Sequence, residues 1–181
     1  MQIIYISIFS FLAHVVCAQS LHYVSSYYAD DLSDWRIYNE EAQEIGVIST
    51  RWSFENNIKE WNVSFNGVSG MIRQKWNNTP DQWEIRFGNS VYIASPSWPN
   101  QYDRWRISNN DDQYVLNWVR DPEGVRWEVE KDGQIIFSFY NEYYGEILDW
   151  IAWQSTTKMD PDLELICIFV PLYYSIIKKY Q

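Results

Sequence analysis

The chain has 181 residues, a length typical of one domain, and a formal net charge of −10. An acidic chain of this kind is repelled by the phosphate backbone of nucleic acids and by anionic lipid surfaces, so nucleic acid is not expected as a partner. Aromatic residues make up 18% of the chain, and because aromatic side chains favour strands, this composition predicts a β-rich fold.

The first eighteen residues carry no charged side chain, and an almost unbroken apolar stretch runs from Ile3 to Val16. This is the length of a signal-peptide core and too short for a membrane-spanning helix. Val16 and Ala18 occupy the −3 and −1 positions of a cleavage site before Gln19. We therefore predict a signal peptide over residues 1–18 and a mature protein that is secreted, periplasmic or associated with the cell envelope.

The mature chain is predicted to be a single domain over residues 19–181. Of the two cysteines, Cys17 lies in the predicted signal peptide and Cys167 in an apolar run near the C-terminus, so the mature chain cannot form an internal disulfide. Two alternatives remain for the N-terminal segment: a buried strand, and a lipid anchor attached at Cys17. In every case the fold depends on its apolar core.

Tryptophan recurs along the chain at a nearly constant interval. In a strand, residues i and i+2 face the same side, so the repeated pattern Trp-x-Ile/Val places two apolar side chains on one face. The spacings are 26, 22, 22, 22 and 23 residues, and a unit of 22 residues holds one β-hairpin. The pattern occurs at Trp35, Trp61, Trp83, Trp105 and Trp127, and a sixth tryptophan follows at position 150. These tryptophans are predicted to form the core.

Turn residues separate the predicted strands. Asn66-Gly67 and Asp132-Gly133 are dipeptides that accept positive φ in tight hairpin turns. Thr79–Gln82 and Ser95–Tyr102 contain prolines, which cannot donate to a strand ladder, and are predicted to be links between hairpins. Ten strands in the repeats and two flanking segments give roughly twelve antiparallel strands, which we predict form a closed or nearly closed barrel.

The last apolar run, Leu163 to Ile177, breaks this pattern. Asp160 or Asp162 can cap a helix and Pro161 suits its first turn, so we predict a helix at about 161–178. The run is apolar on nearly all sides, as expected for a helix that the barrel encloses. Pro171 predicts a bend in the helix or its end near that residue.

A membrane anchor is the competing interpretation of this run. Fifteen residues interrupted by Glu164, Pro171 and Ser175 fall short of the roughly 20 that a spanning helix needs. We therefore expect no transmembrane span.

The Trp-led hairpin from Trp127-Glu128-Val129 through Asp132-Gly133 to Phe137, followed by the apolar helix from Asp160 to Ile177, resembles the tubby C-terminal-like superfamily, which includes the LURP-one-related and phospholipid scramblase-like proteins. The resemblance covers about Tyr23 to Tyr180 and implies a twelve-stranded antiparallel barrel around a central C-terminal helix. Tubby proteins bind phosphoinositide headgroups through a cationic pocket. No matching basic cluster is present here, because the arginines and Lys75 alternate with acidic residues.

No residues with the pattern of a catalytic or metal site stand out. The mature chain has one histidine, His22, and Cys167 is expected to lie in the core. The acidic pairs Asp30-Asp31, Glu40-Glu41 and Asp111-Asp112 could bind calcium weakly but are more typical of solvated turns. We expect no catalytic residue, no cofactor and no metal, and the ligand-binding residues are unknown.

Two functions fit the sequence. The first is a non-catalytic, monomeric interaction module outside the cytoplasm that binds a protein or a lipid. The second is a carbohydrate- or small-ligand-binding barrel that uses exposed tryptophans or its interior. The residues that could form such a platform lie outside the repeat: Trp52, Trp76, Trp98, Trp118 and Trp153. A helix that fills the barrel would exclude an internal ligand site.

Overall fold

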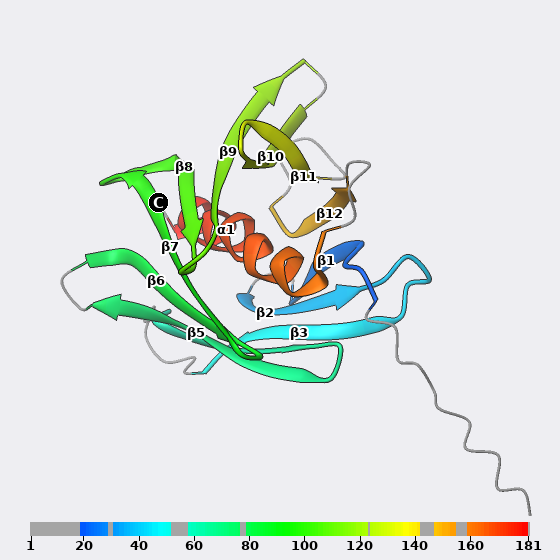
Figure 1. Ribbon diagram of the computed structural model, residues 1–181. Coiled ribbons are helices and arrows are strands. Elements are labelled where there is room, and N and C mark those ends of the chain that lie inside the picture. Colours follow the sequence, from blue (N-terminus) through cyan, green and yellow to red (C-terminus); the bar gives the residue numbers. More distant parts are fainter. Residues whose placement is uncertain are drawn as a thin grey trace, which may run out of the picture.

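The computed structural model describes residues 19–28, 31–51, 58–76, 79–122, 124–141, 147–154 and 159–180. They form a closed barrel of twelve antiparallel strands around one helix (Figure 1), which confirms the predicted fold class. The predicted signal peptide lies outside the described residues. The elements are β1 (Tyr23–Tyr28), β2 (Asp31–Tyr38), β3 (Glu44–Thr50), β4 (Glu60–Phe65), β5 (Val68–Trp76), β6 (Thr79–Phe87), β7 (Ser90–Trp98), β8 (Gln101–Ser108), β9 (Gln113–Asp121), β10 (Gly124–Lys131), β11 (Gln134–Tyr140), β12 (Asp149–Gln154) and α1 (Pro161–Tyr180).

Each strand pairs with the strand that follows it in the chain, and β12 pairs with β1 to close the barrel. In the closing pair, Val24 of β1 lies opposite Trp150 of β12. Because closure leaves no unpaired edge strand around the ring, the barrel avoids the edge-to-edge association to which open sheets are prone.

The tryptophan repeat forms the core, as predicted. Every even-numbered strand contributes one tryptophan that points inward and is at most 1% exposed. The facing strand presents a smaller side chain to the indole: Ile48 opposite Trp35, and Ala94 opposite Trp83. Around Trp127 the packing differs, because its partners on the two neighbouring strands, Trp118 and Phe139, are both large. The six are Trp35, Trp61, Trp83, Trp105, Trp127 and Trp150.

The two predicted tight turns have the required backbone. Asn66 and Gly67 have φ values of 50° and 78°, and Asp132 and Gly133 have values of 51° and 78°. Positive φ at both central residues defines the turn whose twist matches that of the flanking strands.

The two proline-containing links were predicted wrongly, because both are largely strand. Thr79–Gln82 belongs to β6, and Ser95–Trp98 belongs to β7. The last β6–β7 pair is Trp83 with Ala94, so Pro80 and Pro96 lie just beyond it. Proline's missing N–H is tolerated at an unpaired edge. The hairpins β5–β6 and β7–β8 therefore continue as separate two-stranded arms.

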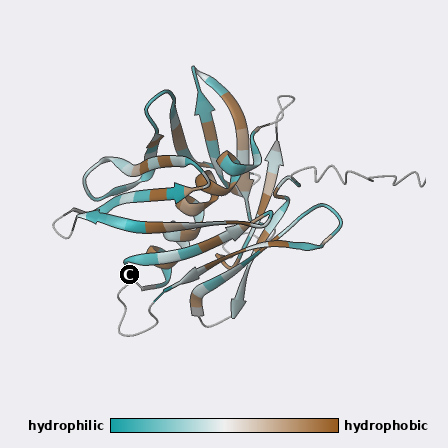
Figure 2. Cartoon of the chain, turned by 60° about the horizontal axis from the view of Figure 1, so that its bottom comes forward, coloured by the Kyte–Doolittle hydropathy of each residue, from teal (hydrophilic) through white to brown (hydrophobic). Residues whose placement is uncertain are grey.

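Helix α1 passes through the barrel (Figure 1) and its apolar side chains, from Leu163 to Ile176, are almost all buried. Hydrophobic residues concentrate on α1 and on alternate strand positions (Figure 2). The ring of Phe169 lies 6.4 Å from that of Trp61 and 5.1 Å from that of Trp83. The interior is thus filled by protein, which excludes the internal ligand site considered above.

The helix does not end near Pro171, contrary to one of the two outcomes predicted from the sequence, but continues through it to Tyr180. An interior proline costs about 3 kcal/mol. Packing offsets this cost, because Phe169 and Tyr173, on either side of the proline, both contact the indole of Trp83. In the described part of the chain, no helix is long and apolar enough to cross a membrane.

Candidate functional site: the aromatic end of the barrel

Because the strands alternate in direction, successive turns fall at opposite ends of the barrel. One end contains the N-terminus of α1: the backbone N–H of Leu21 donates to Glu164 Oε2 there at 2.8 Å. The turns β2–β3, β4–β5, β6–β7, β8–β9 and β10–β11 lie at this end, which we call the acidic end. The C-terminus of α1 and the opposite ends of the strands lie at the other end of the barrel, which we call the aromatic end.

Exposed aromatic side chains are concentrated at the aromatic end. Trp76 ends β5 and is 57% exposed, and Trp98 ends β7 and is 64% exposed. Tyr27 and Tyr28 end β1, and Tyr140 ends β11; all three are exposed. Among the described residues, Trp153 is the one exposed aromatic side chain towards the acidic end, with 54% exposure.

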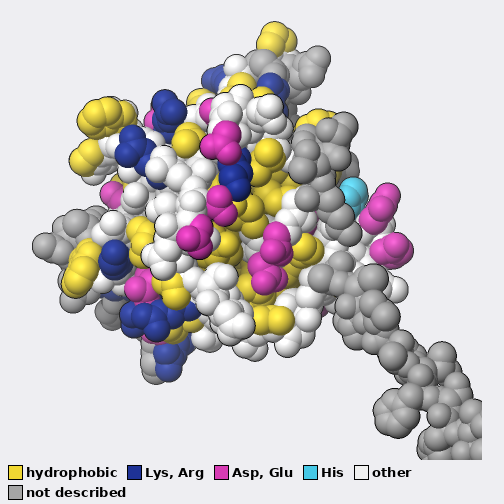
Figure 3. Space-filling view, in the orientation of Figure 1, with side chains coloured by type: hydrophobic (Ala, Val, Ile, Leu, Met, Phe, Trp, Pro, Cys, Tyr) yellow, Lys and Arg dark blue, Asp and Glu magenta, His cyan; other side chains and the backbone are white. Residues whose placement is uncertain are grey.

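Charge is also distributed unevenly. The described connections at the acidic end contain carboxylates and no lysine or arginine; the carboxylates are Glu40, Glu41, Asp111, Asp112, Asp132 and Asp160. The aromatic end has mixed charge, with Lys75, Lys178 and Lys179 beside acidic residues such as Asp103. Figure 3 shows hydrophobic side chains projecting on the left over the β5–β6 and β7–β8 hairpins, near Lys and Arg, while Asp and Glu gather at the centre and right.

Five of the eight arginines pair with carboxylates. Arg73 and Arg86 both pair with Glu84, at 2.8 and 2.7 Å, and the hydrogen bond from Arg86 is the main cause that lowers the pKa of this carboxyl. Arg51 pairs with Glu60 at 2.6 Å. Neighbouring carboxylates thus balance these guanidinium groups, as the alternation in the sequence predicts.

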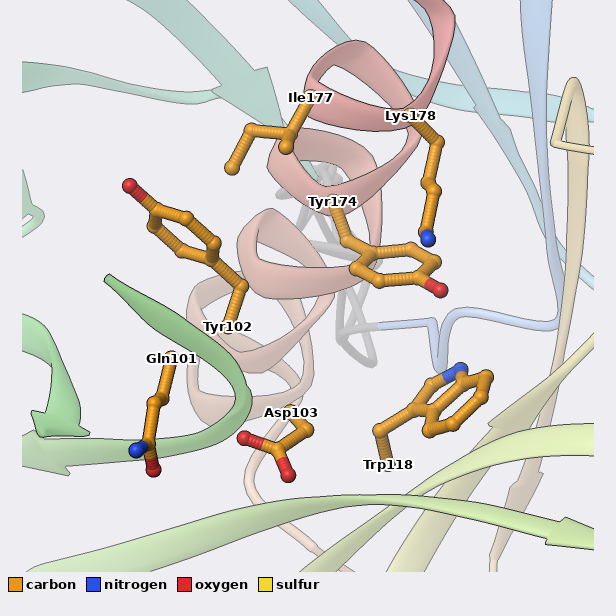
Figure 4. A pocket seen from close by; sticks show the side chains of 7 residues that line it. All are labelled: Gln101, Tyr102, Asp103, Trp118, Tyr174, Ile177 and Lys178. Carbon is orange, nitrogen blue, oxygen red and sulfur yellow. The ribbon is translucent and has the colours of Figure 1, made fainter. Parts of the chain in front are cut away.

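A cleft opens at the aromatic end where β8 and β9 separate (Figure 4). Their last pair is Arg104 with Asn117, and beyond it the strands diverge over the last turns of α1. The cleft has a volume of about 370 Å³, within the range of small-molecule sites. Its lining residues are Gln101, Tyr102, Asp103, Trp118, Tyr174, Ile177 and Lys178.

Three aromatic rings and two opposite charges surround this cleft. The rings of Trp118 and Tyr174 are 6.0 Å apart, and the Lys178 ammonium lies 5.5 Å from the Tyr174 ring centre. Figure 4 shows the Asp103 carboxylate below Tyr174, between Tyr102 and Trp118, with Lys178 on the other side. Neither the Asp103 nor the Lys178 side chain forms an ion pair or hydrogen bond with another described residue.

Asp81 supports the wall of the cleft. Its Oδ1 accepts hydrogen bonds from the Tyr102 hydroxyl at 3.0 Å and from the Tyr173 hydroxyl of α1 at 3.4 Å. Burial, followed by the hydrogen bond to Asp81, raises the pKa of Tyr102 to about 12. Burial and the charge of Asp81 also raise the pKa of Tyr173. Tyr102 is thus fixed beside the cleft with its hydroxyl protonated at neutral pH.

No protein family, no curated protein and no solved structure matches this chain. The function is therefore inferred from the chain's own residues, and the tubby-like family stays a prediction.

The tryptophans outside the repeat divide into two groups. Trp76, Trp98 and Trp153 are exposed on the outer surface, where the sequence placed a possible ligand platform. Trp118 instead points inward at the mouth of the barrel and is half-buried in the cleft. Trp52 lies outside the described residues.

The weak catalytic and metal candidates are not brought together. His22 is exposed and lines a second hollow of similar volume, about 390 Å³, with Tyr23 and Tyr38, near the acidic end. Cys167 is fully buried in α1, and burial raises the pKa of its thiol. No group of three or more metal-ligating side chains occurs among the described residues.

The polar residues of the cleft were not identified from the sequence. Gln101 lies within Ser95–Tyr102, which the sequence predicts as a link between hairpins, and Asp103 directly follows that segment. Lys178 is predicted only as the end of the helix. Pro96 and Pro99 were the available signal: they mark a hairpin that leaves the barrel wall, and such a separation opens a cleft beside the enclosed helix.

Proposed function

We propose that this protein is a non-catalytic interaction module that docks on the surface of a zwitterionic lipid bilayer with its aromatic end. The observation that carries the proposal is the separation of side chains between the two ends: five of the six exposed aromatic residues described lie at one end, and the carboxylate-rich turns at the other. Tryptophan and tyrosine are suited to a bilayer interface, because they have an apolar body and a polar edge.

Charge favours a zwitterionic surface over an anionic one. A protein with a net charge of −10 is repelled by anionic lipids. When the aromatic end faces the bilayer, the acidic end points into solvent, where its carboxylates stay hydrated. The mixed charges of the aromatic end, such as Lys75 and Asp103, then meet a surface that also carries both signs.

Export from the cytoplasm and membership of the tubby-like family belong to the same proposal. The uncharged apolar segment over residues 1–18 supports export. The barrel closed around a C-terminal helix supports the family. The absence of a catalytic function is supported by the single histidine after residue 18, which is exposed, whereas Cys167 is buried in the core.

Vesicle co-sedimentation tests the proposal, with vesicles of phosphatidylcholine alone and of phosphatidylcholine mixed with phosphatidylglycerol. We expect binding to the first and weaker binding to the second. Burying about 60 Å² of each indole contributes about 1.5 kcal/mol, so the double variant Trp76→Ala/Trp98→Ala should bind about a hundredfold more weakly. Trp153→Ala is the matched control, because this tryptophan is similarly exposed but lies towards the acidic end.

Unchanged vesicle binding by the double variant, or equal loss in the control, would contradict the proposal. A carbohydrate-binding protein is the second candidate, and the large exposed face of Trp98 favours it, since sugar rings stack on such surfaces. A glycan array distinguishes the two: glycan binding that is lost in Trp98→Ala, without vesicle binding, would establish the second candidate instead.

A further inference from the structure

The cleft between β8, β9 and the end of α1 offers a more specific binding site than the exposed tryptophans. We infer that it binds a phosphocholine group, with the quaternary ammonium between the aromatic rings and Asp103 and the phosphate at Lys178. This inference rests on the proposed function for the source of the ligand, which would be a lipid headgroup at the docked surface.

The aromatic residues of the cleft would bind the cationic group of the ligand, the quaternary ammonium. Tyr102, Trp118 and Tyr174 line it, and the last two rings are 6.0 Å apart. Cations, and quaternary ammonium groups in particular, bind to the faces of such rings. The Asp103 carboxylate lies beside these three side chains (Figure 4), is exposed and pairs with no described basic residue, so it is available to pair with a bound cation.

The apolar lining of the cleft favours a quaternary ammonium over a primary one. A primary ammonium carries three N–H donors and binds best where oxygen acceptors surround it. The cleft offers acceptors in Asp103, Gln101 and its two tyrosine hydroxyls, but most of its lining is aromatic rings and the aliphatic Ile177, against which methyl groups can pack. A choline group has no N–H to satisfy and is therefore compatible with this lining.

Lys178 would bind the anionic group of the ligand, the phosphate. Its ammonium is exposed, forms no ion pair with a described residue and lies 5.5 Å from the Tyr174 ring centre, on the other side of that ring from Asp103 in Figure 4. The cleft thus presents a negative and a positive side chain separated by aromatic rings. A ligand that carries one positive and one negative charge matches this order, whereas a neutral sugar would leave both charges unpaired.

The position of the cleft suits a lipid headgroup. It opens at the aromatic end, where the β7–β8 hairpin carries the exposed Trp98. When this hairpin contacts a bilayer surface, the cleft is brought to the level of the headgroups. The protein would then contact the bilayer surface through this hairpin and bind a lipid headgroup in the cleft.

Isothermal titration of the full mature chain with water-soluble phosphocholine tests the inference independently of any membrane. We expect one site per chain, weaker binding of phosphoethanolamine and no measurable binding of inorganic phosphate alone. Asp103→Asn and Lys178→Gln should each weaken phosphocholine binding about fivefold or more. The matched controls, Asp111→Asn and Lys131→Gln, change exposed or half-exposed charges towards the acidic end and should leave affinity unchanged.

Absence of phosphocholine binding, equal binding of phosphoethanolamine, or unchanged affinity in Asp103→Asn would each overturn the inference. The vesicle assay separates this failure from that of the proposed function. Vesicle binding without phosphocholine binding would overturn the cleft assignment and leave membrane docking intact. Phosphocholine binding without vesicle binding would overturn docking and identify the free headgroup as the ligand.

Discussion

Asp81 Oδ1 accepts a hydrogen bond from the Tyr102 hydroxyl at 3.0 Å, and this contact joins the outer ends of two hairpins, beyond the last backbone pair of β6 with β7. Asp81 belongs to β6 and Tyr102 to β8, and the Tyr173 hydroxyl of α1 donates to the same oxygen at 3.4 Å. One carboxylate thus connects both hairpins and the helix at the mouth of the barrel. At this end of the barrel the wall of the cleft is therefore held by the hydrogen bonds of Asp81 and not by strand pairing.

This contact predicts a loss of stability at alkaline pH. The pKa of Tyr102 is raised to about 12 in the folded protein, against about 10 in an unfolded chain. A raised pKa contributes stability that is complete below pH about 10 and is lost as the pH rises towards about 12, because the unfolded state then releases the proton first. The free energy of unfolding should fall with a slope of at most about 1.4 kcal/mol per pH unit from this tyrosine.

Urea unfolding between pH 8 and pH 11.5 measures this slope. Tyr102→Phe should flatten it, because phenylalanine cannot ionise. Tyr140→Phe is the control, since Tyr140 is exposed at the same end and should leave the slope unchanged. An identical slope in Tyr102→Phe and the unmodified protein would show that Tyr102 is not the group that titrates.

Ser175 of α1 provides the hydrogen-bond acceptor for the buried indole N–H of Trp150. Its Oγ accepts a hydrogen bond from Trp150 Nε1 at 3.0 Å and donates one to the Pro171 carbonyl at 3.1 Å. Ser175→Ala would leave the buried indole N–H without this acceptor, so we expect a loss of about 1–3 kcal/mol. Chemical denaturation of Ser175→Ala, Trp150→Phe and the double variant measures the coupling. Strictly additive losses would show that the two side chains do not interact.

The sequence predicted the barrel well because its signals are local. A tryptophan followed by an aliphatic residue two positions later indicates which face of a strand is buried, and Asn66-Gly67 indicates a tight turn. Both signals depend only on neighbouring residues. The enclosed helix followed from its lack of a polar face. These features required no knowledge of which distant segments meet.

The cleft could not be predicted in the same way, because it depends on where pairing stops. Trp118 lies outside the tryptophan repeat, and nothing in its sequence context shows that it points inward; it lines a cleft because β8 and β9 separate beyond the pair Arg104 and Asn117. Asp103 and Lys178 are far apart in sequence. Asp103 and Lys178 line the same cleft because of the orientation of α1 about its axis inside the barrel. The packing of Phe169 and Tyr173 against Trp83 fixes this orientation.

Gly70 provides a test of how closely neighbouring strands approach. A Cβ at this position would lie 2.5 Å from the Arg86 carbonyl oxygen and 2.6 Å from Phe87 Cδ2. Replacing glycine by alanine stabilises a compatible site by about 0.4–1 kcal/mol, but overpacking costs about 1–3 kcal/mol. Since one contact is with backbone, which cannot move aside, we expect Gly70→Ala to lower stability. Thermal unfolding measures the change, with the exposed neighbour Ser69→Ala as control. A variant as stable as the control would show that the strands relax.

Glu164 holds the segment that precedes β1 to the helix inside the barrel. Its carboxylate is fully buried in the first turn of α1 and accepts the Leu21 N–H at 2.8 Å. Glu164→Gln retains an oxygen acceptor of the same size, so we expect a loss of about 1 kcal/mol. Glu164→Ala removes the acceptor and leaves a buried donor and a cavity, so the loss should reach about 2–4 kcal/mol.

Hydrogen exchange at the Leu21 amide distinguishes this contact from a general weakening of the core. In Glu164→Ala the Leu21 amide should lose protection by more than amides in β4 or β10, because the segment can detach while the barrel stays closed. In Glu164→Gln that extra loss should be small. Asp162→Asn, in the same helical turn but only partly buried, is the control and should leave Leu21 protected. Equal loss of protection across all strands would mean that Glu164 supports the whole core and does not act specifically on the N-terminal segment.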